Sequence, residues 1–122
     1  MQKVGNMSDT SNSSINARFW GQDPRFVVIG DDHYPVLLTE YLENGAYCED
    51  LTEFHGYREQ FFALAERRAK AVLVRNGQDF EGEDDPEWEM IGLYELANVA
   101  LKGNKLRCVV GRLIDKVEEE DV

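Results

Sequence analysis

The sequence predicts an α+β fold in which an N-terminal antiparallel β-meander of three to four strands packs against two to three C-terminal helices. In the first half of the chain, turn-forming residues separate short runs of β-branched and aromatic residues, a pattern typical of hairpins. In the second half, apolar residues recur every three or four positions, as they do on one face of a helix. With 122 residues, 43% of them hydrophobic, the chain has enough material for one core.

We expect a single domain over residues 15–117, flanked by two tails. Residues 1–14 are rich in Ser, Asn and Thr, so we predict a disordered N-terminal tail. Residues 118–122 form an acidic C-terminal tail in this prediction. The chain shows neither an apolar run of membrane-spanning length nor a secretory signal, and its two cysteines have no CxxC spacing. We therefore expect a cytoplasmic protein.

Three turns define the predicted meander, which covers residues 17–53. The runs ARFW and RFVVIG are separated by Gly21–Pro24, which predicts a first hairpin. Asp31 and Asp32 follow RFVVIG and predict a second turn. Asn44-Gly45 predicts a type I′ turn, because both central residues of that turn need a positive φ. Pro35 restricts its own strand to a sheet edge or a bulge, because proline has no backbone N–H to donate.

The predicted helices follow from the spacing of apolar residues. The first covers residues 57–75 and ends at Asn76-Gly77. The second begins at Pro86 and runs to Gly103. The third carries an apolar stripe from Leu106 to Val117, which also predicts a homodimer if a second copy covers it. The sequence leaves open whether Gly103 separates two helices or bends one.

A different division of the same residues predicts a small α/β receiver-like sandwich. If RFVVIG is a parallel strand and Pro35 opens a helix, strands and helices alternate along the chain. In that register VVIGDDH resembles the first strand and acidic pair of bacterial response-regulator receiver domains. The resemblance implies a weak Mg²⁺ site at Asp31 and Asp32. Arg75 stands where that family has its phosphate-accepting aspartate, so the resemblance implies a degenerate signalling domain without phosphotransfer.

No catalytic pattern is recognisable in the sequence. His33 and His55 lack the spacing of metal ligands, and no serine lies in a GxSxG context. The glycines are isolated rather than grouped in a phosphate-binding loop. We therefore predict a protein that is not an enzyme and that binds no cofactor or metal.

The charge balance is the most informative bulk property. The chain has 24 acidic and 13 basic residues and a formal net charge of −11, which opposes binding to nucleic acid or to an anionic membrane. No Lys or Arg occurs between Arg25 and Arg58, and a second acidic block begins at Asp79. In bulk composition the chain resembles small phage and plasmid inhibitors of host defence or transcription, some of which mimic DNA. We therefore predict an acidic interaction protein that binds and inhibits a basic macromolecule, such as a nucleic-acid-binding protein.

The predicted contact surface combines carboxylates with aromatic anchors, because Tyr and Trp often anchor protein interfaces. Its members are Asp31, Asp32, Glu40, Glu43, Tyr47, Glu49, Asp50, Glu83, Asp84, Asp85 and Trp88.

Overall fold

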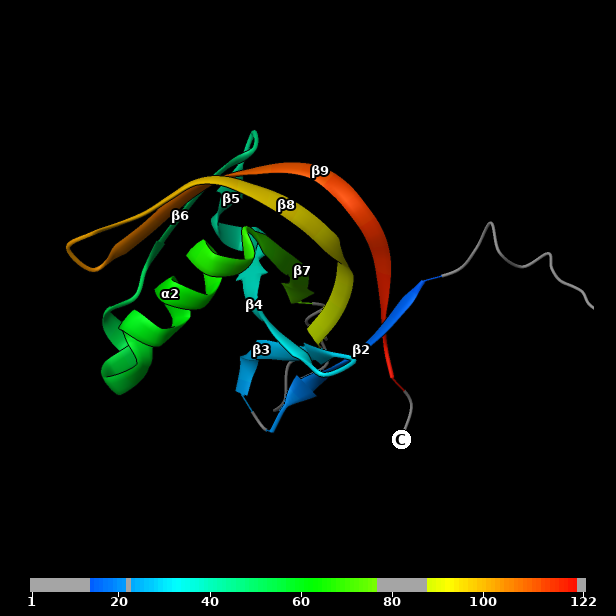
Figure 1. Ribbon diagram of the computed structural model, residues 1–122. Coiled ribbons are helices and arrows are strands. Elements are labelled where there is room, and N and C mark those ends of the chain that lie inside the picture. The colour runs from blue at the N-terminus through cyan, green and yellow to red at the C-terminus, as the bar shows by residue number, and fades with distance from the viewer. Residues whose placement is uncertain (1–13, 22, 77–87, 121–122) are drawn as a thin grey trace, which may run out of the picture.

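The computed structural model describes residues 14–21, 23–76 and 88–120, and most of them belong to one mixed sheet of eight strands (Figure 1). The strand order is β2-β3-β4-β7-β8-β9-β6-β5. The strands are β2 (Ile15–Trp20), β3 (Asp23–Ile29), β4 (Asp32–Leu38), β5 (Leu42–Glu43), β6 (Ala46–Asp50), β7 (Lys70–Asn76), β8 (Trp88–Lys102) and β9 (Lys105–Glu119). The helical segments are the 3₁₀ helices η2 (Thr39–Tyr41) and η3 (Thr52–Tyr57) and the α-helix α2 (Arg58–Arg68).

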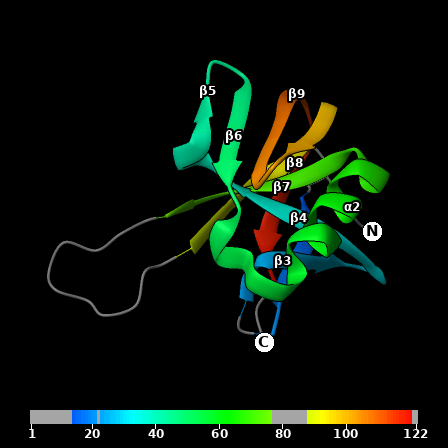
Figure 2. The same cartoon turned by 90° about the vertical axis from the view of Figure 1, so that its left-hand side faces the viewer.

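The sheet closes on itself through its first and last strands. β2 pairs with β3 and also, in parallel, with the C-terminal end of β9, where Ile15 lies opposite Val117. The strands β2, β3, β4, β7, β8 and β9 therefore form a closed ring. The long β8–β9 hairpin curves over α2 (Figure 1). The N-terminal part of β9 pairs with β6 instead, so the β5–β6 hairpin stands beside β9 at the edge of the sheet (Figure 2).

The predicted second and third helices are wrong, because these residues form β8 and β9. The error has a physical cause in the bulges of this hairpin. The pairing register shifts between Leu93 and Tyr94, between Tyr94 and Leu96, and again before Ala100. The pairing of β8 with β7 also shifts between Gly92 and Met90, so Met90 and Leu93 join the same cluster. Leu96 is buried in the other cluster because both faces of β8 are covered there, and the resulting three-residue intervals imitate a helix. Gly103, with a φ of 63°, lies in the turn between the two strands and neither separates nor bends a helix.

The predicted helix over residues 57–75 is too long. α2 ends at Arg68, and Ala69 adopts the left-handed conformation with a φ of 53° while its N–H donates to the Ala65 carbonyl at 2.9 Å. The chain then enters β7, in which the four residues from Ala71 to Val74 are all buried. Such a continuous apolar run is typical of a strand that is covered on both faces, and it carries no helical period of its own.

The predicted turns are confirmed, although the predicted meander is not continuous. β2, β3 and β4 are joined by antiparallel hairpins, and Asn44 and Gly45 have φ values of 52° and 84° between β5 and β6. β5 does not continue the sheet from β4, because β4 pairs in parallel with β7 and β6 pairs with β9. Pro35 lies in an interior strand rather than at an edge. The paired residues of β4 and β7 begin one position later, at Val36.

The receiver-like alternative is also wrong. β3 and β4 are adjacent antiparallel strands joined through Gly30 and Asp31, and residues 32–38 form a strand where that fold needs a helix. Asp31 and Asp32 therefore belong to a hairpin rather than to the carboxyl end of a parallel strand. The Mg²⁺ site implied at this pair required the receiver fold, which this chain does not have.

Two apolar clusters make up the core, one on each side of β4 and β7. Alternate side chains of these strands face opposite ways, so Leu37 and Leu73 join the cluster under α2 while Val36 and Val72 join the cluster inside the ring. The first cluster includes Phe61 of α2. Full burial of a large side chain of this kind contributes about 1.5–3 kcal/mol, so the centrally placed β4 and β7 stabilise both halves of the fold.

The C-terminal end of β9 pairs with β2 and does not form a separate tail. Glu118 and Glu119, which we expected in an acidic tail, lie opposite Asn16 and Ala17 of β2. The predicted N-terminal tail lies outside the described residues, apart from Ser14. Within the described part of the chain, no helix combines the length and the apolar character needed to cross a membrane.

Candidate functional site

A hollow of about 500 Å³ lies where the chain passes from η2 through β5 into β6. We call it the acidic hollow, and its lining residues are Glu40, Tyr41, Leu42, Glu43, Asn44, Ala46 and Cys48. The Asn44-Gly45 turn reverses the chain here, so that β5 and β6 face each other across two residue pairs. This local geometry is encoded by the turn itself and brings Glu40 and Glu43 to one concavity.

The acidic hollow combines negative charge with an aromatic ring. Glu40 and Glu43 are exposed, and Tyr41 is 39% exposed despite its large ring. Partial burial raises the pKa of Tyr41 above its usual range, and the carboxylates of Glu40 and Glu49 add to that effect. Carboxylates beside an aromatic face are the groups that bind the ammonium of Lys or the guanidinium of Arg.

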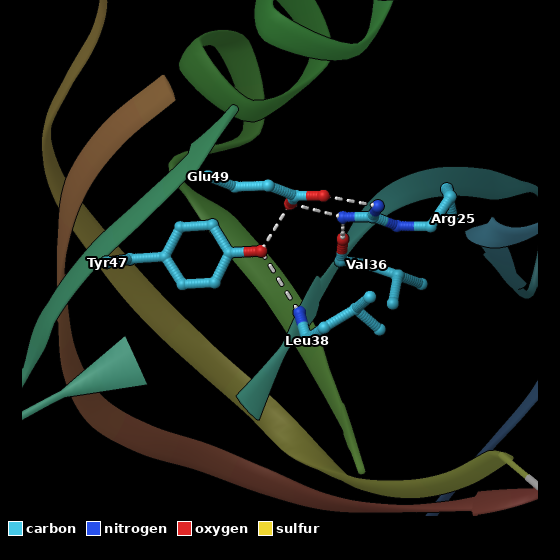
Figure 3. Close-up of polar contacts among 5 residues, drawn as sticks. All are labelled: Arg25, Val36, Leu38, Tyr47 and Glu49. Atoms are coloured by element: carbon cyan, nitrogen blue, oxygen red, sulfur yellow. Dashed lines mark hydrogen bonds and ion pairs between the residues drawn. The ribbon is translucent and has the colours of Figure 1, made fainter. Parts of the chain in front are cut away.

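Tyr47 lies beneath Tyr41, with the two ring centroids 6.3 Å apart in an edge-to-face arrangement. Its hydroxyl donates to Glu49 Oε1 at 2.5 Å and accepts from the Leu38 backbone N–H at 3.1 Å (Figure 3). Burial raises the pKa of the Tyr47 hydroxyl above its usual range, and the charge of Glu49 raises it further. Tyr47 therefore stays protonated and connects Tyr41, which lines the acidic hollow, to the buried network.

The interior holds an ion pair between Arg25 of β3 and Glu49 of β6. The two guanidinium nitrogens of Arg25 each donate to one carboxylate oxygen of Glu49 at 2.7 Å, and one of them also donates to the Val36 carbonyl at 3.1 Å (Figure 3). Arg25 is 8% exposed and Glu49 4% exposed. The guanidinium carbon lies 4.8 Å from the ring centroid of Phe54, which adds a cation–π contact.

The electrostatics keep Arg25 charged. Burial lowers the pKa of Arg25, but the hydrogen bond and the charge of Glu49 outweigh burial and raise the pKa overall. The negative charge of Glu49 is therefore neutralised inside the protein and is not presented to a partner.

The structure brings together only part of the predicted contact surface. Glu40 and Glu43 meet in the acidic hollow. Asp31 and Asp32 are exposed in the β3–β4 hairpin, where Asp32 lies 3.6 Å from Arg68 of α2. Asp50 ends β6 and accepts hydrogen bonds from the backbone N–H and hydroxyl of Thr52, which lower the pKa of that carboxyl. These carboxylates do not line a common hollow.

The remaining predicted contact residues are buried or lie outside the described part of the chain. Tyr47 is 2% exposed, and Glu49 is engaged with Arg25, so neither side chain is accessible to a partner. The alternation of β6 places Tyr47 and Glu49 on the same face, and the fold covers that face. Trp88 is half-buried and packs against the apolar cluster inside the ring. Glu83, Asp84 and Asp85 lie outside the described residues.

Arg25, which forms the buried ion pair, was not predicted as a functional or structural residue from the sequence. Its signal was present, because an arginine inside the β-branched run RFVVI must either point to solvent or find a buried carboxylate. The run supplies one candidate position but not the partner, which lies 24 residues away.

The stripe from Leu106 to Val117, predicted to mediate self-association, is part of β9. Leu106, Cys108 and Val117 are buried in the core, whereas Val109 and Leu113 are 43% and 40% exposed. Self-association through this segment stays a prediction, now restricted to those exposed side chains.

Among the described residues, no three His, Cys, Asp or Glu side chains gather as metal ligands would. Comparisons with models of known protein families, with curated proteins and with solved structures find no match for this chain.

Proposed function

We propose that this protein binds a basic segment of a partner protein through the acidic hollow. The observation that carries the proposal is the pairing of two exposed carboxylates, Glu40 and Glu43, with the exposed ring of Tyr41 in a hollow of about 500 Å³. No Lys or Arg occurs in the sequence from Phe26 to Tyr57, so nearby basic side chains from the same segment do not compete for this position.

A lysine or arginine of the partner enters the hollow with its charge near the carboxylates and its aliphatic stem against Tyr41. An exposed cation–π contact contributes about 0.5–1 kcal/mol, and an exposed ion pair contributes about 0–1 kcal/mol. One such contact is too weak for stable binding. The partner segment therefore carries several basic residues, and the net charge of −11 accelerates their encounter with the protein.

The buried hydrogen-bond network of Tyr47 and Glu49 restricts the position of Tyr41 in the acidic hollow. Tyr47 contacts Tyr41 edge-to-face and is itself held by Glu49 and the Leu38 N–H. A side chain held by packing loses less conformational entropy on binding than a free one, so the hollow is pre-organised for a partner.

We further propose that the partner is a nucleic-acid-binding protein in the cytoplasm, whose basic surface is blocked while it is bound. The acidic balance of the whole chain supports this class of partner. The two cysteines are both free thiols, which supports a reducing compartment.

The test is the binding of a labelled arginine- and lysine-rich peptide, measured by fluorescence anisotropy at low and moderate salt. The double variant Glu40→Gln/Glu43→Gln is compared with Glu118→Gln/Glu119→Gln, which removes the same charge at the far end of β9. We expect the first variant to bind about tenfold more weakly than the second, a difference of about 1.4 kcal/mol.

Equal losses in both variants would show that only net charge matters and would contradict the acidic hollow as the site. A pull-down from a cell lysate with the same two variants then identifies the natural partner, which is retained by Glu118→Gln/Glu119→Gln and lost with Glu40→Gln/Glu43→Gln.

A further inference from the structure

A second hollow, which we call the aromatic pocket, lies between the β2–β3 hairpin and one side of α2. Its volume is about 520 Å³, and it is lined by residues of β2, β3, β4, η3 and α2. Pockets that hold small organic molecules measure roughly 300–1,000 Å³ and occur where several elements meet. The aromatic pocket satisfies both conditions.

Three aromatic residues form its walls. Trp20 lies edge-to-face with Phe26, at a centroid distance of 6.3 Å and an angle of 83°, and Phe26 contacts Tyr57 at 5.8 Å. Leu64 of α2 is buried and adds an apolar contact. Trp20 is 57% exposed, which leaves much of its indole available for a further ring. Aromatic pairs gain about 0.5–1.5 kcal/mol beyond the area that they bury, so these walls favour a planar ligand.

The polar groups of the pocket favour an anion. Among the described residues that line it, Arg67 and His33 are the ionisable groups other than Tyr57, and no Asp or Glu is present. Two carboxylates of the surrounding elements are already paired, Asp32 with Arg68 at 3.6 Å and Glu59 with Arg58 at 3.2 Å. A pocket lined in this way is unusual in a chain with a net charge of −11, since most of its charged surface repels anions.

His33 is held in place at the rim. Its ring lies 5.7 Å from Trp20 in an edge-to-face arrangement, and its backbone carbonyl accepts a hydrogen bond of 2.9 Å from Arg68 Nε. The guanidinium of Arg68 also lies 5.0 Å from the ring centroid of Tyr34, which fixes the position of the arginine. The rim beside Arg67 therefore carries side chains with specific neighbours, namely His33 against Trp20 and Arg68 against Tyr34.

We propose that the aromatic pocket binds a small planar aromatic carboxylate. The ligand ring packs against Trp20 and Phe26, and its carboxylate accepts hydrogen bonds from the guanidinium of Arg67 and from His33. Arginine binds carboxylates through two parallel hydrogen bonds, which gives the site a preferred ligand orientation. This site differs from the acidic hollow in both its residues and the sign of the charge that it attracts.

Three probes of the same shape test the proposal: 2-naphthoate, the neutral 2-naphthamide and the cationic 2-naphthylmethylamine. The readout is the indole N–H resonance of Trp20 in NMR spectra. Trp88 is the internal reference, because it packs against the apolar cluster inside the ring and does not line the aromatic pocket. We expect naphthoate to shift the Trp20 resonance and to bind about tenfold more tightly than the amide, as a charge-assisted contact predicts. We expect the cationic probe to bind most weakly.

Matched variants locate the anion contact. Arg67→Gln should remove the preference for naphthoate over the amide, whereas Arg112→Gln, which removes an exposed charge on β9, should retain it. Trp20→Ala should abolish binding of every probe. Equal binding of the three probes, tighter binding of the cationic probe, or an unshifted Trp20 resonance would overturn the proposal. The wild-type comparison decides the question even if a variant fails to fold.

Discussion

Arg25 and Glu49 are joined by two hydrogen bonds of 2.7 Å although their strands, β3 and β6, are not neighbours in the sheet. Arg25 also donates to the Val36 carbonyl, where the pairing of β4 with β7 begins, and Glu49 lies opposite Leu106 near the end of the pairing of β6 with β9. Side chains therefore connect two parts of the sheet that have no backbone hydrogen bonds to each other along this line.

Removing one member of this pair should strongly destabilise the fold. Glu49→Ala leaves the Arg25 guanidinium buried without its carboxylate, and losing one partner of a buried pair costs about 3–5 kcal/mol. Urea unfolding followed by tryptophan fluorescence measures the loss. Glu43→Ala is the control, because Glu43 is exposed on β5, and we expect it to change stability by less than about 0.5 kcal/mol. Similar values for the two variants would contradict the structural role of the pair.

Replacing both members by apolar residues gives a different expectation. In Arg25→Met/Glu49→Leu no charge is left buried, so we expect the double variant to be more stable than Glu49→Ala. The same urea experiment tests this comparison. If the double variant is the less stable of the two, the uncompensated charge of Arg25 is not the main cost of Glu49→Ala.

The hydroxyl of Tyr47 should contribute separately. Tyr47→Phe keeps the ring but removes the donor to Glu49 and the acceptor for the Leu38 N–H, and leaving buried polar groups unsatisfied costs about 1–3 kcal/mol. Tyr34→Phe is the matched control, because the contact of Tyr34 to Arg68 is made by its ring. Thermal unfolding should show a lower Tm for the first variant, and unchanged Tm values in both would count against the network.

Gly92 should not tolerate a side chain. A Cβ at this position would lie 2.6 Å from Leu113 Cδ1 and 3.2 Å from the Asp115 carbonyl, so the Leu113 side chain would have to rotate and the backbone at Asp115 would have to move slightly away. We expect Gly92→Ala to cost about 1–3 kcal/mol. At Gly111 of β9 the nearest atom would be 3.6 Å away, an ordinary contact, so Gly111→Ala should be nearly neutral. Chemical denaturation of the two variants compares them directly.

Stability should fall under alkaline conditions because of Cys108. Burial raises the pKa of this thiol from 9.0 to about 11. The folded state therefore keeps a proton that the unfolded state releases, so the contribution is complete below pH 9 and is lost as the pH rises toward 11. Burial and Glu49 also raise the pKa of Tyr47, which acts in the same direction above pH 10.

Urea unfolding at pH 8 and at pH 10.5 tests the Cys108 contribution. The decrease in stability between these two values should be smaller in Cys108→Ala than in the wild-type protein. An equal decrease in both proteins would show that groups other than Cys108 cause the loss of stability at alkaline pH.

The sequence predicted those features of the fold that depend on residues close together in the chain. The Asn44-Gly45 turn and the hairpins on either side of β3 follow from local backbone preferences, and the structure confirms them. The start and type of α2 were also predicted. The end of α2 was not, because Ala69 is an unusual residue for a left-handed helix end and gives no signal in the sequence.

The features that the sequence did not predict depend on contacts between segments that are distant in the chain. β8 has buried residues at helical intervals because its pairing with β7 shifts register and because both of its faces are covered, and both conditions are set by the neighbouring strands. Glu49 carries the same local signal as Glu43, yet one is buried by Arg25 and the other is exposed. The sequence therefore predicted Glu40 and Glu43 as contact residues but could not separate them from carboxylates, such as Glu49, that the fold buries.

The pairing of Ile15 with Val117 has a consequence for folding kinetics and for aggregation. This contact joins nearly the whole length of the described chain, so closing the ring carries a large loop-closure cost and should come late in folding. Until β2 docks, β3 and the C-terminal part of β9 each present an unpaired edge to other chains. Proteolytic loss of β2 would make that exposure permanent, and the product would be an aggregation-prone open sheet.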